Sequence, residues 1–239
     1  MIAQNLAQIR EQVERAAGRA GRRAEEITLV GVSKTVAAEK IREAHEAGVR
    51  HFGENRVQER EEKSEAVRGL DVTWHLVGHL QSNKAKRAAK LFHAVDSIDG
   101  WPLAERLDKA MKERVAREGA ARLRVLIEVR VSEETTKTGA HEADLPGLAE
   151  KVMSLANLDL QGLMCIPPLF GEIEPVRAYF RRLRELRDQL AARLGVALPV
   201  LSMGMSHDFE MAIEEGATEV RVGTALFGER EAARGAARA

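Results

Sequence analysis

The sequence predicts a (β/α)8 barrel, also called a TIM barrel, formed by a single α/β domain with an extra N-terminal helix. Three observations favour this fold class. Short apolar segments typical of strands alternate along the chain with amphipathic segments typical of helices. The chain has 239 residues, close to the ~250 that such barrels typically need. No G-x-G-x-x-G motif follows the first strand candidate, which weakens the rival fold, a doubly wound open sheet, without excluding it.

The elements follow from hydrophobic periodicity, taken in chain order. An opening helix over about residues 2–17 is predicted because its apolar residues recur at helical spacing on one stripe. Short apolar runs predict strands at residues 27–34, 51–55, 73–78, 94–99, 124–131, 160–166, 198–204 and 219–228. Amphipathic segments predict helices near residues 37–47, 56–67, 82–91, 101–117, 142–156, 173–194 and 207–215. Several of these helices end at a glycine, which adopts the left-handed conformation that stops a helix. The barrel domain is predicted to cover residues 1–230, and residues 231–239 a flexible tail.

Composition excludes several broad classes. Hydrophobic residues make up 44% and charged residues 31% of the chain, as is typical of a soluble globular protein. Basic and acidic residues number 37 each, so no net field favours nucleic acid or a membrane. The single cysteine, Cys165, cannot form an intrachain disulfide, which fits a reducing compartment. The sequence has neither a secretory signal nor an apolar stretch near the ~20 residues that span a bilayer. We expect a cytoplasmic monomer that binds neither nucleic acid nor membrane.

One lysine stands at the end of the first predicted strand, where the segment LVGVSK passes into a helix. Active sites of such barrels lie at the carboxyl ends of the strands, and Lys34 is at such an end. A closed barrel pairs the first strand with the last, which carries Arg221 between Val220 and Val222. If the valines face the outer helices, Arg221 faces the interior beside Lys34. Two neighbouring cations repel each other, so an anion or a covalent change at the lysine is required. Pyridoxal 5'-phosphate (PLP) supplies both, through a Schiff base to the amine and through its phosphate.

Phosphate groups in these barrels often bind at the loops after strands seven and eight. In the first of these loops, Ser206 precedes a helical pattern and is predicted to be its N-cap, and Gly204 allows a close approach of the backbone. In the second, Gly223 and Thr224 offer backbone amides and a hydroxyl. The sequence therefore predicts a phosphate site close to Lys34.

Each residue of this set also has an ordinary structural interpretation. Lys34 alone could be a solvated lysine at a helix entry, Ser206 only a helix cap, and Gly223 only a turn. Arg221 could form a structural ion pair with the inward-facing Glu128. The functional interpretation depends on the joint placement of these residues.

Several segments resemble one known family. GVSKT, HFGENRVQE, WHLVGHLQSNKAK, GLMCIPP and LSMGMSHDFEMAIEEGATEVRVGTALFGER are similar, in this order, to the pyridoxal phosphate homeostasis protein family, from about residue 29 to 230. The resemblance implies the fold of the alanine racemase N-terminal domain and PLP held as an internal aldimine on Lys34. It implies that Asn55 lies near the cofactor ring, that Arg221 faces the pyridine nitrogen, and that His75 lies at the rim. It also implies that the phosphate is bound by Ser206, Gly223 and Thr224, with Ser202 and Met203 nearby. Lys137 resembles a family lysine near the barrel mouth.

The family is not known for substrate turnover, and the residues offer a partial reason. PLP catalysis usually needs a protonated pyridine ring, and arginine does not give up a proton to support one. The only tyrosine, Tyr179, lies in a predicted helix and is not an obvious second base. The seven histidines lack metal spacing. We therefore expect a protein that holds and exchanges PLP without catalysis, with apo PLP-dependent enzymes as candidate recipients. Two alternatives stay open, an amino-acid racemase and a sugar-phosphate enzyme that uses Lys34 without PLP.

Overall fold

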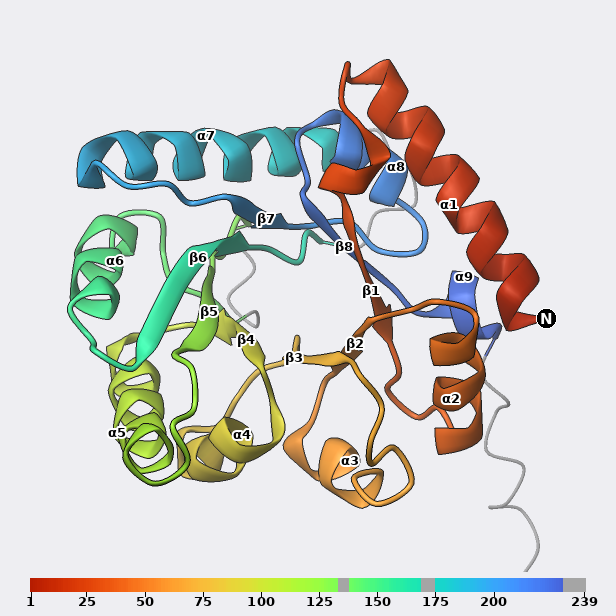
Figure 1. The fold of residues 1–239 in the computed structure, drawn as a ribbon. Coiled ribbons are helices and arrows are strands. Elements are labelled where there is room, and N and C mark those ends of the chain that lie inside the picture. Colours follow the sequence, from red (N-terminus) through yellow and green to blue (C-terminus); the bar gives the residue numbers. More distant parts are fainter. Residues whose placement is uncertain (133–137, 169–174, 230–239) are drawn as a thin grey trace, which may run out of the picture.

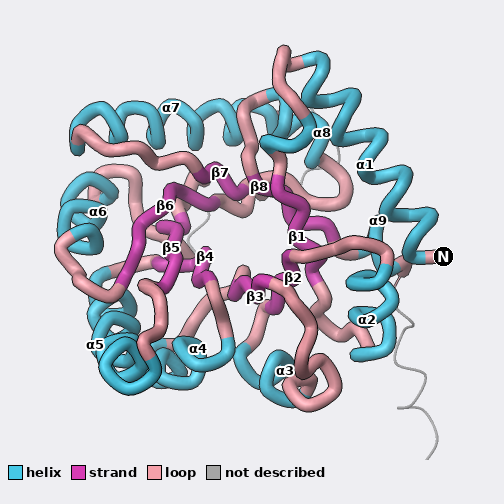
Figure 2. Tube along the Cα trace, in the orientation of Figure 1, coloured by secondary structure: helices cyan, strands magenta, loops and turns pink. Residues whose placement is uncertain are grey.

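The barrel predicted from the sequence is confirmed in the structure, a computed structural model that describes residues 1–132, 138–168 and 175–229. All strands are parallel, and they close in the order β1-β2-β3-β4-β5-β6-β7-β8 around one interior (Figures 1 and 2). The strands are β1 (Thr28–Val32), β2 (His51–Glu54), β3 (Thr73–Leu76), β4 (Ala94–Ile98), β5 (Leu123–Glu128), β6 (Leu158–Met164), β7 (Val200–Ser202) and β8 (Glu219–Val222).

Helices form a layer outside the strands, as Figure 1 shows. They are α1 (Ile2–Arg19), α2 (Ala38–Glu46), α3 (Val57–Glu62), α4 (Ala85–Leu91), α5 (Trp101–Glu118), α6 (Leu145–Met153), α7 (Val176–Leu194), α8 (Phe209–Glu214) and α9 (Thr224–Phe227). Short 3-10 helices lie at η1 (Ala24–Glu26) and η2 (Ser82–Lys84). None of the helices within these described ranges is both long and apolar enough to cross a membrane.

The N-terminal helix α1 buries the apolar stripe that predicted it. Ile2, Leu6, Ile9 and Val13 are each at most 8% exposed, and they join the main hydrophobic cluster. The helix lies on the outside of the barrel beside α8 and α9 (Figure 1). Burial of a large aliphatic side chain contributes about 1.5–3 kcal/mol. The extra helix is therefore an integral part of the fold.

The first and last strands pair directly, which was the assumption behind the predicted site. In this register Val30 lies opposite Arg221. The last strand is shorter than the predicted 219–228, because it ends at Val222 and the chain turns into α9. Gly223 makes the turn close to β1, since a Cβ atom there would lie 3.4 Å from the Val32 carbonyl oxygen.

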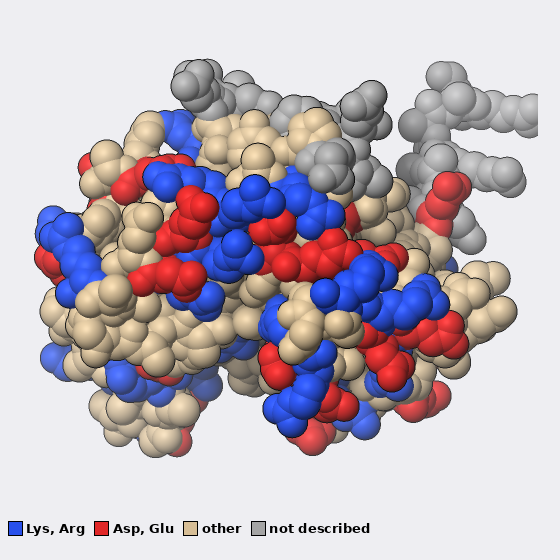
Figure 3. Space-filling model, turned by 90° about the horizontal axis from the view of Figure 1, so that it is seen from above, with Lys and Arg blue, Asp and Glu red and all other residues tan. Residues whose placement is uncertain are grey.

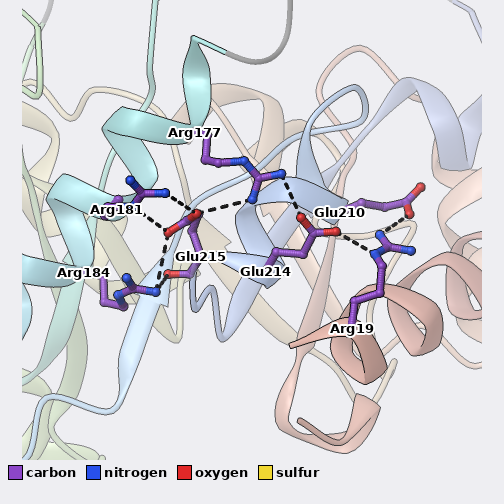
Figure 4. Close-up of polar contacts among 7 residues, drawn as sticks. All are labelled: Arg19, Arg177, Arg181, Arg184, Glu210, Glu214 and Glu215. Atoms are coloured by element: carbon purple, nitrogen blue, oxygen red, sulfur yellow. Dashed lines mark hydrogen bonds and ion pairs between the residues drawn. The ribbon is translucent and has the colours of Figure 1, made fainter. Parts of the chain in front are cut away.

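An ionic network fixes the short helix α8 between α1 and α7 (Figure 4). Arg19 of α1 contacts Glu210 at 2.9 Å and Glu214 at 2.7 Å. From the other side, Arg177 of α7 contacts Glu214 at 2.8 Å and Glu215 at 3.3 Å. Because α8 has only 6 residues, these contacts supply an anchorage that its own hydrogen bonds cannot. The network thereby fixes one end of the loop that follows β7.

Charged side chains of opposite sign are interleaved on the face drawn in Figure 3. Basic and acidic atoms alternate there over short distances, as the equal totals of 37 and 37 in the sequence lead one to expect. Such mixing favours solubility over attraction of one charged partner.

Gly162 in β6 provides a sharp test of the strand packing. A Cβ atom at this position would lie 1.9 Å from the Val200 carbonyl oxygen of β7. We expect Gly162→Ala to lower the free energy of unfolding by about 3 kcal/mol, because the two strands must separate. Gly147→Ala is the matched control, since nothing lies within 4 Å of its Cβ position and alanine favours the helix by about 0.5–1 kcal/mol. Urea unfolding of both variants measures the difference, and equal midpoints would contradict the packing described.

Candidate functional site

Lys34 lies at the carboxyl end of the barrel, two residues after the end of β1. The chain leaves the sheet at Ser33, whose backbone amide still donates to the Gly53 carbonyl of β2 at 2.8 Å. Lys34 itself is half-buried. The lysine therefore stands at the mouth where active sites of this architecture are built.

Arg221 points into the barrel from β8, as the flanking valines predicted. It is 4% exposed, whereas Val220 and Val222 are buried in the hydrophobic cluster around the strands. One guanidinium nitrogen donates to Ser202 Oγ at 2.7 Å and another to the Cys165 carbonyl at 2.8 Å. These hydrogen bonds to the ends of β7 and β6 fix the plane of the guanidinium.

The alternative ion pair between Arg221 and Glu128 is not formed between these two described side chains. Glu128 instead accepts a hydrogen bond from Thr138 Oγ1 at 2.9 Å. Burial raises the pKa of Glu128, and the hydrogen bond from Thr138 only partly opposes this.

The loops after β7 and β8 meet at Ser206. Its hydroxyl oxygen accepts from the Gly223 amide at 3.1 Å and from the Ala225 amide at 3.3 Å. The prediction that Ser206 caps the following helix is wrong, because Asp208 is the N-cap residue of α8. Ser206 instead accepts hydrogen bonds from amides at the start of α9. Two backbone amides thus converge on one oxygen atom, an arrangement that also suits a phosphate oxygen.

Glycine is required where the backbone passes close to α8. Gly204 has φ +92°, and a Cβ atom there would lie 2.6 Å from the Cβ of Ala212. The neighbouring Met203 is buried, and its amide donates to the Glu219 carbonyl at 3.1 Å. Thr224, the first residue of α9, is exposed. The backbone at Gly204 therefore packs directly against α8.

Asn55 follows β2 directly and is half-buried. Its backbone packs against the chain after β3, since a Cβ atom on Gly78 would lie 2.4 Å from the Asn55 carbonyl oxygen. Asn55 is therefore at the same carboxyl end of the barrel as Lys34.

His75 is not at the rim, and that part of the prediction is wrong. It lies on β3, is 0% exposed, and belongs to a polar cluster inside the barrel. Its Nδ1 contacts Asp96 Oδ2 at 2.9 Å and its Nε2 contacts His51 Nδ1 at 3.0 Å. Glu219 Oε2 lies 3.9 Å from the same Nδ1 and accepts from Arg124 at 2.6 Å. His51 and Glu219 are the first residues of β2 and β8, so the cluster extends to the amino-terminal end of the strands.

Charge balance explains how this cluster is tolerated. Burial alone would lower the pKa of His75, but the carboxylates of Asp96 and Glu219 outweigh burial and raise it. Burial tends to raise the pKa of Glu219, yet His75 and Arg124 hold it below its usual range. Burial and the charge of Glu219 raise the pKa of Asp96, and His75 opposes this change. When His75 is protonated and Asp96 is ionised, the charges of His75 and Arg124 balance those of Asp96 and Glu219. An uncompensated charge at this depth would be costly.

The two contacting histidines have opposite pH dependence. Burial, reinforced by the charge of His75, lowers the pKa of His51 to about 4. The unfolded chain protonates His51 near the ordinary pKa of about 6.5, whereas the folded protein protonates it only near 4. The folded protein therefore loses stability as pH falls from about 6.5 towards 4. His75, with a raised pKa, contributes stability that is lost only as pH rises through its folded value.

We therefore expect His51→Gln to reduce the loss of stability between pH 6.5 and pH 4. Glutamine does not titrate and can still accept the hydrogen bond from His75. Urea unfolding of the wild type and the variant at several pH values measures this slope. His45→Gln, on the outer helix α2, is the control. A wild-type slope in His51→Gln would show that His51 is not the titrating group.

Some residues near the site were not singled out by the sequence reasoning. Glu54, Glu59 and Lys63 contact the chain around Lys34. Glu54 and Glu59 lie in the segment HFGENRVQE, and Lys63 follows it by four residues. A charged residue at the end of a buried strand, such as Glu54, is itself a usable signal because it requires a partner. Lys137 lies outside the described residues.

Comparison with known proteins gives a consistent family. The family described as the alanine racemase N-terminal domain matches residues 4–231. A pyridoxal phosphate homeostasis protein of Aquifex aeolicus is 48% identical over 229 residues, covering 95% of this chain and 98% of that protein. The protein of the same name from Pseudomonas aeruginosa is 46% identical and covers 96% of both chains.

Two solved structures extend the comparison. PipY of Synechococcus elongatus PCC7942, solved with PLP bound, superposes with a TM-score of 0.83 at 38% identity, covering 95% of this chain and 100% of that chain. An alanine racemase of Clostridium difficile 630 superposes with a TM-score of 0.78 at 15% identity and is covered over 57% of its own length. The racemase comparison therefore shows the shared fold.

Proposed function

The chain belongs to the alanine racemase N-terminal domain family and, within it, to the pyridoxal phosphate homeostasis proteins, and from this membership we propose that it binds PLP covalently and exchanges it without turning over a substrate. The observation that carries the proposal is the closure of the barrel at β1 and β8, which puts Arg221, Gly223 and the Lys34 turn at one mouth. A PLP-bound relative at 38% identity supports the same ligand.

The described residues fit the cofactor. When bound, PLP supplies an aldehyde for a Schiff base and a ring that can withdraw electrons. Lys34 provides the amine, whose condensation with the aldehyde releases one water molecule. The amides of Gly223 and Ala225, with Ser206, offer the phosphate a set of donors. We assign Thr224, at the start of α9, to the phosphate as well, with the buried Ser202 and Met203 nearby at the end of β7.

Arg221 is the residue that argues against catalysis. Its guanidinium N–H groups donate to Ser202 Oγ and to the Cys165 carbonyl. We propose that the guanidinium faces the pyridine nitrogen. Arginine keeps its proton at any physiological pH, so it cannot support a protonated ring nitrogen. The electron-withdrawing power of the ring is then weak, which favours storage over chemistry on a bound amino acid. Asn55 is assigned to the edge of the ring.

His75 enters the proposal through its neighbours. It lies near Glu219, and a hydrogen bond with Ser202 helps hold the pKa of Glu219 down. Ser202 in turn accepts from Arg221. The buried cluster therefore supports the orientation of Arg221 from below. The proposal also includes a cytoplasmic monomer that passes PLP to apo PLP-dependent enzymes, and the name of the relatives, pyridoxal phosphate homeostasis protein, supports PLP as the ligand.

Reduction with borohydride followed by peptide mass mapping tests the attachment. We expect the reduced pyridoxyl group on the peptide that contains Lys34. Recovery of the group on another lysine would overturn the assignment. A protein without yellow colour and without cofactor mass after incubation with PLP would favour a sugar-phosphate enzyme instead.

Incubation of the purified holo-protein with L-alanine or D-alanine separates the carrier from the racemase. We expect no interconversion at ordinary enzyme rates of about 1–10³ s⁻¹, because Arg221 leaves the ring unprotonated and the only tyrosine, Tyr179 of α7, is not an obvious second base. Chiral chromatography of the amino acid measures the rate, with an alanine racemase as positive control. Racemisation in that range would replace the carrier proposal by the enzyme alternative.

A further inference from the structure

The turn that carries Lys34 has an unusual backbone. Thr35 has φ +61° and is the only non-glycine residue with positive φ in the described part of the chain. The Val36 amide donates to the Ser33 carbonyl at 3.0 Å, so Lys34 and Thr35 are the two central residues of a tight turn. A positive φ at the second central position favours glycine. A threonine stays in this conformation only where its surroundings hold it.

Helix α3 holds both peptide groups that flank Lys34. Lys63, the C-cap residue directly after the helix, donates from Nζ to the Ser33 carbonyl at 2.8 Å. Glu59, one turn earlier, accepts from the Thr35 amide at 3.0 Å. The first hydrogen bond fixes the peptide before Lys34 and the second fixes the peptide after it. Together they determine the direction in which the lysine leaves the backbone.

A buried carboxylate anchors this arrangement. Glu54 is 0% exposed; its Oε1 lies 2.8 Å from Lys63 Nζ and accepts from Ser33 Oγ at 2.7 Å. Burial raises the pKa of Glu54, and the ammonium of Lys63 opposes that change. Glu54 ends β2 and directly precedes Asn55. The ends of β1 and β2 and the end of α3 are thus joined at one ion pair of low exposure.

Resting on the proposed function, we propose that Glu59 and Lys63 are positioning residues that aim the Lys34 amine and so determine how firmly PLP is held. A correctly placed amine favours the Schiff base over its hydrolysis, in which water adds to the C=N bond and returns the free amine and the aldehyde. Misplacement of a reacting group by about 1 Å costs up to ~10²-fold in rate. Loosening the turn therefore speeds release of the cofactor.

The test uses the full-length holo-protein and two substitutions at one position. Glu59→Ala removes the acceptor for the Thr35 amide, whereas Glu59→Gln keeps a side-chain oxygen that can accept it. We expect hydroxylamine to remove PLP from Glu59→Ala about tenfold faster than from the wild type, with Glu59→Gln close to the wild type. Decay of the visible absorbance of bound PLP gives the rate. Glu61→Ala, on the same helix and paired with Arg87 outside the site, is the matched control.

Lys63→Met provides a second, independent variant, and Lys63→Arg restores the cation. We expect Lys63→Met to shift the pH profile of the PLP absorbance and Lys63→Arg to restore it in part. A purely structural role would lower the thermal unfolding temperature and leave the pH profile unmoved. If Lys63→Met does not fold, the half-buried Glu59 still decides the matter.

Failure of this inference can be separated from failure of the proposed function. Wild-type rates and profiles in both Glu59→Ala and Lys63→Met, with borohydride still mapping PLP to Lys34, would overturn the positioning role alone. Absence of the pyridoxyl group from Lys34 in the wild type would overturn the proposed function, and the positioning role with it.

Discussion

Lys34→Ala is expected to abolish covalent attachment of PLP, with complete loss of the visible absorbance of the Schiff base. The Lys34 amine is the assigned partner of the aldehyde, and alanine leaves no nucleophile at this position. Noncovalent binding through the Ser206 loop and Arg221 should persist with lower affinity. Absorbance spectra and dialysis of protein mixed with PLP measure the two effects.

Lys40→Ala, on the outward side of α2, is the control for loss of a lysine. It should retain the wild-type spectrum. An unchanged spectrum in Lys34→Ala would exclude Lys34 as the attachment point, and a colourless wild type would point to a ligand other than PLP.

Glu219→Ala is expected to have the largest effect on stability. The glutamate is 1% exposed, pairs with Arg124 at 2.6 Å and lies 3.9 Å from His75. Its removal leaves a buried excess of positive charge, because the pKa of His75 is raised partly by this carboxylate. Breaking a buried ion pair by removing one partner costs about 3–5 kcal/mol.

Urea unfolding at pH 7 measures this loss, and Glu210→Ala, which removes a partner of Arg19 at the surface, should have a small effect. The destabilisation of Glu219→Ala should shrink as pH rises, since deprotonation of His75 removes part of the excess charge. A destabilisation no larger than that of Glu210→Ala would show that the cluster is not held by charge balance.

The fold was predictable from the sequence because the hydrophobic periodicity of each helix and strand lies within a short segment. The alternation of short apolar runs and amphipathic helices gave the barrel, and the stripe of Ile2, Leu6 and Ile9 gave α1. The end of β8 was mispredicted, because VGTALF reads as an apolar strand continuation. The turn at Gly223 beside Val32 is a feature of the three-dimensional structure that the apolar pattern does not reveal.

The candidate site was predictable to a lesser degree. Lys34 and Arg221 could be placed from strand alternation and barrel closure alone. The partners of Ser206 could not, because its hydrogen bonds to Gly223 and Ala225 join residues 17 and 19 positions away. The same holds for His75, whose surroundings come from several strands. A residue's depth along the barrel axis depends on strand stagger, which the sequence pattern does not reveal.

The hydroxyl of Ser206 has a consequence for the proposed binding and release of the PLP phosphate. The amides of Gly223 and Ala225 donate to the Ser206 hydroxyl oxygen. On binding of a phosphate as proposed, these amides would exchange that acceptor for a phosphate oxygen. A buried donor without a hydrogen-bond acceptor costs about 1–3 kcal/mol. The Ser206 hydroxyl avoids this cost when no phosphate is bound. If the chain exchanges PLP as proposed, Ser206 lets these two amides stay hydrogen-bonded both with and without the phosphate.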